Sequence, residues 1–250
     1  MDEQGFIEQI AEDALQAAAE VDAIQEHDLE FQDFAGDFKG RWMIAATDGS
    51  ARDGVAAYSV VFPGGRGGGS GDASEDQSPF RAELKALMIL FQAILRAQDQ
   101  GLEPRVLWVV VDCQSALDAL AAPGASCLPL LATKAAEGLR ALRRSGWQVC
   151  TVWCPSHGKK PEWRAQGPLQ HQLCRLLNEE ADAQARRTME KRRSGSLRVR
   201  WKQLAVEAED WEKRAICVSA KASDIYGAHF TELRRRSRET ACGSADDSHD

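Results

Sequence analysis

Six consecutive apolar residues, Val106–Val111, constrain the fold of this 250-residue chain more than any other segment. A strand that is apolar at every position is buried on both faces, as in the centre of a sheet that helices cover on both sides. Residues 79–100 and 128–144, on either side of this run in the sequence, carry apolar side chains at helical spacing. The chain therefore predicts a layered α/β domain.

The remaining elements indicate a mixed sheet. Residues 41–47 and 54–62 predict two paired strands, and glycine-rich residues 64–71 predict a mobile loop that runs into a short edge strand. The later elements are expected in this order: a short helix from Ser115, the helix over 128–144, a last strand over 147–154, and a helix over 169–190. Strands that alternate with helices require a partly parallel sheet, whereas a hairpin requires an antiparallel part.

Both ends of the chain differ in composition from its middle. Residues 1–40 hold 12 Asp or Glu and one Lys, and their apolar residues recur at helical spacing. We expect an acidic helical arm over 1–39, a domain over 40–190, and a helical extension with a polar, disordered tail over 191–250. Two roles for this arm remain open. It could compete with a polyanion for the basic middle of the chain, or it could only keep the chain soluble.

Composition also restricts partners and location. Residues 41–200 hold 22 Lys or Arg and 16 Asp or Glu, a balance that suits a polyanionic partner. No run of about 18 apolar residues is present, which argues against a membrane span. The acidic N-terminus is unlike a signal peptide. Seven cysteines without regular spacing indicate reduced thiols and an intracellular protein, in either the nucleus or the cytoplasm.

Four carboxylates stand where strand ends and helices can bring them together. Asp48 and Asp112 follow predicted strands, and Glu83 and Asp182 lie in predicted helices. Clustered carboxylates repel one another unless a positive charge joins them, and hard oxygen ligands suit Mg²⁺ or Mn²⁺. Two such ions about 4 Å apart can clamp both reacting oxygens of a phosphodiester. The pattern predicts a metal-dependent nuclease.

Five short motifs, taken together, resemble the type 1 ribonuclease H family. They are Thr47-Asp48-Gly49-Ser50, Arg81-Ala82-Glu83-Leu84, Asp112-Cys113-Gln114, Ser156-His157-Gly158 and Asn178-x3-Asp182. The last two look most like the ribonuclease H domains of non-LTR retrotransposon reverse transcriptases. The resemblance covers residues 41–187. It implies a ribonuclease H-like fold, with a five-stranded mixed sheet whose first three strands are antiparallel, and hydrolysis of the RNA strand of RNA–DNA hybrids.

The resemblance also implies roles for individual residues. Two Mg²⁺ ions, or Mn²⁺, would be held by Asp48, Glu83, Asp112 and Asp182. His157 would assist proton transfer or product release, which suits a side chain with an ordinary pKa of about 6.5. The substrate would be contacted by Gly49, Ser50, Arg81, Gln114 and Asn178.

The chain also departs from the family pattern. Pro79 and Phe80 replace polar residues that read the groove, and a basic insertion is absent between Ala121 and Trp147. Four basic residues on or near one predicted helix could hold the phosphates of the DNA strand: Lys134, Arg140, Arg143 and Arg144. A tethered reverse transcriptase domain is therefore the partner we expect.

Three other interpretations remain at this stage. One is an integrase-type strand transferase on the same fold, and another is a catalytically silent hybrid-binding module. The third is a zinc site built from Cys150, Cys154, His157, His171 and Cys174. Along a strand the α-carbons of Cys150 and Cys154 would be about 13 Å apart, which favours buried thiols over zinc ligands.

Overall fold

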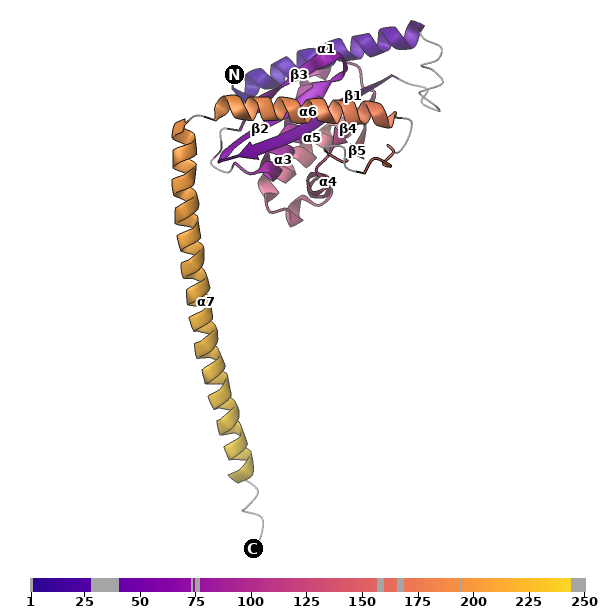
Figure 1. Ribbon diagram of the computed structural model, residues 1–250. Coiled ribbons are helices and arrows are strands. Elements are labelled where there is room, and N and C mark those ends of the chain that lie inside the picture. Colours follow the sequence, from indigo (N-terminus) through magenta and orange to yellow (C-terminus); the bar gives the residue numbers. More distant parts are fainter. Residues whose placement is uncertain are drawn as a thin grey trace. The chain divides into compact units, whose positions relative to one another are not determined.

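The computed structural model describes residues 2–27, 41–72, 74, 77–156, 160–165, 169–193 and 195–243 (Figure 1). Within these ranges the side chains of residues 24–27, 195–198 and 237–243 are left out of the description. The chain divides into two units, Met1–Arg198 and Val199–Asp250. The first unit carries all five strands.

The sheet has the strand order β3-β2-β1-β4-β5. Its strands are β1 (Trp42–Arg52), β2 (Val55–Phe62), β3 (Arg66–Gly71), β4 (Val106–Val111) and β5 (Gln148–Trp153). The first three strands are antiparallel to one another, whereas β4 is parallel to both β1 and β5. All six residues of β4 are buried, as its unbroken apolar run predicts. This order and these directions define a ribonuclease H-like fold.

Helices cover both faces of the sheet (Figure 1). They are α3 (Pro79–Asp99), α4 (Gln114–Ala121), α5 (Pro129–Arg144) and α6 (His171–Arg192). Alternate residues of β1 divide between the two layers: Met43 and Ala45 share a core with α3, and Ile44 and Ala46 share one with α6. This is the period of two that a strand imposes on its side chains.

The hairpin between β1 and β2 is tighter than the sequence predicts. We expected β1 to end at Thr47, before a turn over residues 48–54. Instead β1 continues to Arg52, and the turn is Asp53–Gly54, both with positive φ. Two such residues are the preferred connection between antiparallel strands. Asp48 therefore lies inside a paired strand.

Helix α1 (Glu3–His27) packs into the first unit, where we expected an arm outside the domain. Phe6, Ile10 and Ala14 are buried in the same core as α3, and the Phe6 ring lies edge-on to Tyr58, 5.8 Å between centroids. Its acidic residues pair with distant basic ones: Glu3 with Lys85, Glu8 with Arg96, Glu20 with Arg66 and Asp22 with Arg105. The acidic composition thus complements basic residues of the domain that lie far away in sequence.

Glycine-rich residues 64–71, expected as a mobile loop that runs into a short edge strand, form that edge strand over most of their length (β3), and the strand is held between two helices. A Cβ at Gly68 would lie 3.3 Å from the Phe6 ring of α1. A Cβ at Gly69 would collide with Thr188 of α6. Both helices therefore approach the β3 backbone closely, which only residues without side chains allow.

Helix α7 (Gly195–Gly243) occupies most of residues 191–250, where the sequence predicts a helical extension with a polar, disordered tail. It includes Thr240, where we expected a disordered tail to begin, and residues 244–250 lie outside the described part of the chain. None of the helices in the described ranges is apolar over a length sufficient for a membrane span.

Candidate active site

Two carboxylates meet where β1 and β4 run side by side. Thr47 of β1 is paired with Val111 of β4 in parallel, so the next residues, Asp48 and Asp112, stand beside each other. Asp48 is only 4% exposed and Asp112 is half-buried. The fold therefore places both aspartates at one edge of the central strands, as the sequence predicts.

Glu83 joins them from the first turns of α3 because Gly49 lets that helix approach β1. A Cβ at residue 49 would lie 2.7 Å from the carbonyl carbon of Ala82 and 2.8 Å from its Cβ. Distances this short are not compatible with any side chain. Helix α3 begins with Pro79, and Ser78 caps it by accepting the Arg81 N–H at 3.3 Å. Glu83 is buried as a result.

Asp48, Glu83 and Asp112 form a compact oxygen cluster. Each offers one carboxylate oxygen, and these oxygens all lie within 4.8 Å of one another. Glu83 Oε2 is buried without a hydrogen-bond partner in the described part of the chain. Carboxylate oxygens are the ligands that Mg²⁺ and Mn²⁺ prefer, so the residues present fit a divalent cation of this type.

The electrostatics of the cluster also favour a cation. Burial, followed by the charges of Asp112 and Asp182, raises the pKa of Asp48 to about 8. Burial, followed by the charges of Asp48 and Asp112, holds the pKa of Glu83 well above its ordinary value. A hydrogen bond from the Gly49 amide opposes both shifts. Without a cation the cluster retains protons near neutral pH.

Asp182 lies beside this cluster and is not among the three residues whose oxygens are within 4.8 Å. It is close enough for its charge to raise the pKa of both Asp48 and Glu83. Its carboxylate is 23% exposed and accepts a 2.5 Å hydrogen bond from Arg186, one turn later in α6. One turn earlier, Asn178 is 2% exposed, and its Oδ1 has no hydrogen-bond partner among the described residues.

The other residues suggested by the motifs occupy varied positions. Gln114 is exposed at the first position of α4 and donates to Asp118 at 3.0 Å. Ser50 is half-buried on β1. Arg81 donates from Nε to buried Asp72 at 2.5 Å, so its guanidinium is engaged within the domain. Phe80 packs against the core. His157 lies outside the described residues.

Sequence reasoning missed two residues beside the cluster, Trp153 and Arg186. The Trp153 indole Nε1, at the end of β5, donates to the main-chain carbonyl of Asp112 at 2.9 Å. Lys160 Nζ lies 4.8 Å from the centre of the Trp153 ring. Arg186, the partner of Asp182, is the second. The one available signal for Trp153 was an aromatic residue near the end of the predicted last strand.

The proposed cysteine ligands for zinc are not supported. Cys150, Cys154 and Cys174 are free thiols. Burial raises the pKa of Cys154 to about 11 and that of Cys174 to about 12, as expected of buried structural thiols. Among the described residues, the acidic cluster is the one group of three or more His, Cys, Asp or Glu side chains close enough to share an ion.

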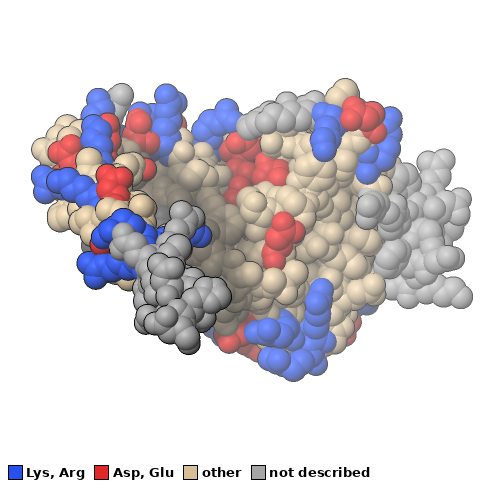
Figure 2. Space-filling model, turned by 90° about the horizontal axis from the view of Figure 1, so that it is seen from below, with Lys and Arg blue, Asp and Glu red and all other residues tan. Residues whose placement is uncertain are grey.

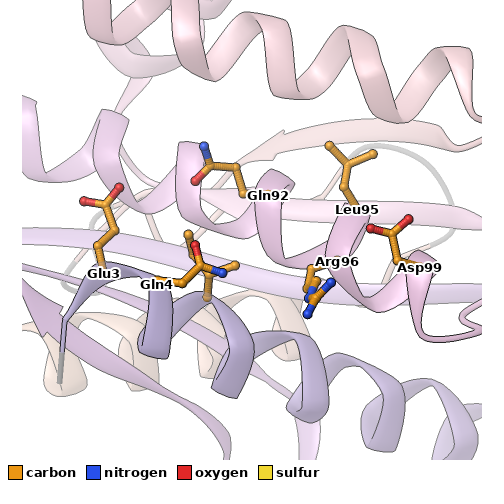
Figure 3. A pocket seen from close by; sticks show the side chains of 7 residues that line it. Glu3, Gln4, Gln92, Leu95, Arg96 and Asp99 are labelled. Atoms are coloured by element: carbon orange, nitrogen blue, oxygen red, sulfur yellow. The ribbon is translucent and has the colours of Figure 1, made fainter.

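A pocket of about 490 Å³ between α1 and α3 lies apart from the acidic cluster (Figure 3). Glu3 and Gln4 line it from α1, and Gln92, Leu95, Arg96 and Asp99 line it from α3. Gln92 is nine residues beyond Glu83, about 13 Å along the helix at 1.5 Å per residue. The residues that line this pocket include none of the clustered carboxylates, so the pocket is separate from the acidic cluster.

Basic side chains are spread over several clusters. On the face that Figure 2 shows, Lys and Arg gather in separate groups. Lys134, Arg140, Arg143 and Arg144 of α5 are all exposed. Arg143 also donates to the Val149 carbonyl at 3.3 Å. These residues could contact phosphates without forming one continuous groove.

No protein-family model matches the sequence, and no curated protein matches it. The chain is similar to 97 chains of solved structures, of which three serve as examples. The first is RNase H1 of the archaeon Halobacterium salinarum NRC-1, 20% identical over 60% of this chain and 98% of its own, with a TM-score of 0.38. The second is an N-terminal RNase H domain from Mycobacterium tuberculosis, 18% identical over 60% and 94%, with a TM-score of 0.40.

The third is LC11-RNase H1 in complex with an RNA/DNA hybrid, from a protein isolated from compost by a metagenomic approach. It is 16% identical over 60% of this chain and 97% of its own, with a TM-score of 0.42. Similarities this remote add no argument about function, and the fold itself follows from the strand order and the strand directions.

Proposed function

We propose that this chain is a hydrolase that cuts the RNA strand of RNA–DNA hybrids endonucleolytically and requires two divalent ions, Mg²⁺ or Mn²⁺. The observation that carries the proposal is the convergence of Asp48, Glu83 and Asp112 at one edge of a ribonuclease H-like sheet. The raised pKa values of Asp48 and Glu83 mean that a cation that replaces their protons stabilises the cluster.

The metal-holding residues that we propose are Asp48, Glu83 and Asp112, with Asp182 completing the second position. Asp182 can hold a cation at this position only if its carboxylate gives up the ion pair with Arg186. Bound divalent ions lower the pKa of bound water and mask the charge of the phosphodiester. The protein itself holds the carboxylates in place through the β1–β4 pairing, the close approach at Gly49, and the Trp153 hydrogen bond to Asp112.

Substrate selection is assigned to residues around the cluster. A hybrid presents 2′-hydroxyls in a wide minor groove, where side-chain amides can read them. We assign this role to Gln114 and to main-chain groups of Gly49 and Ser50. Asn178, which the sequence also suggested, is only 2% exposed, so it acts at most by positioning α6. Arg81 acts indirectly, since its ion pair with Asp72 holds the first turns of α3. His157 assists proton transfer or product release.

We also propose a tethered reverse transcriptase domain as the partner that delivers the hybrid. The motifs around His157 and Asp182 resemble those of retrotransposon ribonuclease H domains, and the absent basic insertion leaves this chain with fewer phosphate contacts of its own. A fusion that adds such a domain should lower the KM for hybrid and leave kcat unchanged.

The test is a cleavage assay with Mg²⁺ and matched labelled RNA–DNA, RNA–RNA and DNA–DNA duplexes. Only the RNA strand of the hybrid should be cut, and Asp48→Asn should abolish cleavage. Asp99→Asn, at the exposed end of α3, is the matched control and should retain activity. Equal cleavage of duplex DNA would replace this proposal with an integrase-type transferase.

The Asp182–Arg186 ion pair favours one alternative, a silent hybrid-binding module. In such a module the guanidinium would hold the fourth carboxylate permanently. Binding of the hybrid without any cleavage, in Mg²⁺ and in Mn²⁺, would establish the module and reject the enzyme.

A further inference from the structure

Helix α7 carries an apolar stripe from Trp201 to Ile225, in the second unit. Its residues alternate in steps of three and four positions: Trp201, Leu204, Ala208, Trp211, Ala215, Val218, Ala222 and Ile225. This is a heptad repeat with Trp201 and three alanines at the a positions and Leu204, Trp211, Val218 and Ile225 at the d positions. Figure 1 shows α7 as one continuous helix.

The large residues of the stripe are exposed to solvent. The exposed fractions are 47% for Leu204, 69% for Trp211, 67% for Val218 and 72% for Ile225. A helix in water is stable chiefly when such a stripe is buried against another element. A contiguous exposed apolar surface of this kind is typical of an interface.

Three of the four a residues are alanines, whereas all four d residues are large, and this difference selects the partner; Trp201 is the exception and would face Ile225 at the ends of an antiparallel pair. In a parallel pair like positions meet, so Ala208, Ala215 and Ala222 would each face their own copy and leave space, while Trp211 would face Trp211. In an antiparallel pair each a residue faces a d residue of the partner. Trp211 then packs on Ala215, Val218 on Ala208, and Leu204 on Ala222, which is the alternation of large and small that close packing requires.

We propose that α7 pairs with α7 of a second copy of this chain as an antiparallel coiled coil. One alignment, with Trp211 facing Ala215, satisfies all three large-to-small layers at once. The helix is thus complementary to itself, and two copies form a closed, two-fold symmetric pair.

Charge supports the same direction. Residues 199–212 hold two basic and four acidic residues, whereas residues 213–236 hold six basic and two acidic. An antiparallel pair places the acidic part of each helix beside the basic part of the other. In the same alignment Glu207 flanks Lys221 of the second copy at both ends. At the centre of the pair, Arg214 faces Arg214 and Glu212 faces Glu212 of the second copy, so like charges meet there. The preference for the antiparallel direction therefore comes mostly from the packing of large residues on alanines.

The first experiment measures the mass of the full chain by sedimentation velocity across micromolar concentrations. We expect a species of twice the 27.5 kDa chain mass. Val218→Glu, within the stripe, should give a monomer. Val206→Glu, outside the stripe but similarly exposed at 60%, should remain dimeric. Circular dichroism of both variants checks that the chain remains folded.

A monomeric wild-type chain at every concentration would overturn the proposal, whatever else covers the stripe. Equal dissociation of both valine variants would overturn it as well, because it would show that the stripe is not the contact. A stoichiometry above two would exclude the closed pair.

The direction of pairing has its own test. Glu207→Lys should raise the dimer dissociation constant several-fold, since it places two basic residues together at each end. The double variant Glu207→Lys with Lys221→Glu should restore the wild-type value. In a parallel pair Glu207 would face Glu212 of the second copy, so a tighter dimer for Glu207→Lys alone would reject the antiparallel arrangement.

Discussion

The hydroxyl of Ser59 donates a buried 2.8 Å hydrogen bond to the main-chain carbonyl of Ala181. Ser59 is paired with Asp48 across β1 and β2, and Ala181 precedes Asp182 in α6. This one contact therefore sets the position of the fourth carboxylate relative to the first. A helix from late in the chain is fixed to a strand from early in it, directly beside the proposed metal site.

Removing this hydroxyl should weaken both the fold and the site. Ser59→Ala should lower the free energy of unfolding by about 1 kcal/mol, the usual net value of such a bond. It should also reduce hybrid cleavage several-fold, because α6 can then shift against β2. Urea unfolding and the cleavage assay measure the two effects. Ser115→Ala, at an exposed position of α4, is the control and should change neither.

The acidic cluster should make the metal-free protein less stable as pH rises. The pKa of Asp48 is about 8 in the folded chain, above its ordinary 3.8, so the folded state binds the proton more tightly than the unfolded state. Stability linked to this proton is present at low pH and is lost as pH rises from about 4 to 8.

Asp48→Asn should remove this dependence. With a chelator present, we expect the variant to be more stable than the wild type by roughly 2–4 kcal/mol at pH 8.5 and nearly equal to it at pH 4. Urea midpoints at the two pH values measure the difference. A wild-type chain whose stability rises steadily through this range would contradict the assignment of the raised pKa.

Magnesium should displace protons from the cluster on binding. Because the pKa of Asp48 is about 8 and that of Glu83 is also raised, calorimetry in buffers of different ionisation enthalpy should show proton release when Mg²⁺ binds. Mg²⁺ at ten times its dissociation constant should also stabilise the fold by about 1.4 kcal/mol. Both effects should disappear in Asp112→Asn and persist in Asp118→Asn, whose carboxylate lies outside the cluster.

Periodicity and strand ends were sufficient to predict the part of the fold that holds the site. The run Val106–Val111 predicted the central strand, and the parallel pairing that follows from it brought Asp48 and Asp112 together. Glu83 was predicted from its place in the helix over 79–100 and from the motif Arg81-Ala82-Glu83-Leu84. These are local patterns, and local patterns are visible in a single sequence.

Contacts between distant residues were not visible. Helix α1 was placed outside the domain because its acidic residues looked solvated, whereas Asp22 pairs with Arg105 and Glu8 with Arg96. The glycines of β3 looked mobile because nothing in their own segment shows the helices on both sides. Arg186 was missed since its partner, Asp182, was already assigned to metal.

Arg186 should compete with the cation for Asp182. Arg186→Gln removes the guanidinium that holds this carboxylate, so the Mg²⁺ concentration for half-maximal cleavage should fall several-fold. Arg187→Gln, on the neighbouring exposed position of α6, should leave it unchanged. A rise in the required Mg²⁺ for Arg186→Gln would instead show that Arg186 contacts the substrate or positions Asp182.

Gly49 should tolerate no side chain. A Cβ there would lie 2.7 Å from the Ala82 carbonyl carbon, so Gly49→Ala must push the first turn of α3, and Glu83 with it, away from β1. We expect a loss of at least about 2 kcal/mol in the free energy of unfolding, typical of overpacking, and cleavage reduced by more than tenfold. Gly124→Ala is the matched control, because a Cβ at that position meets nothing within 4 Å. Equal behaviour of the two variants in urea unfolding and cleavage would show that the close approach of α3 to β1 does not position Glu83.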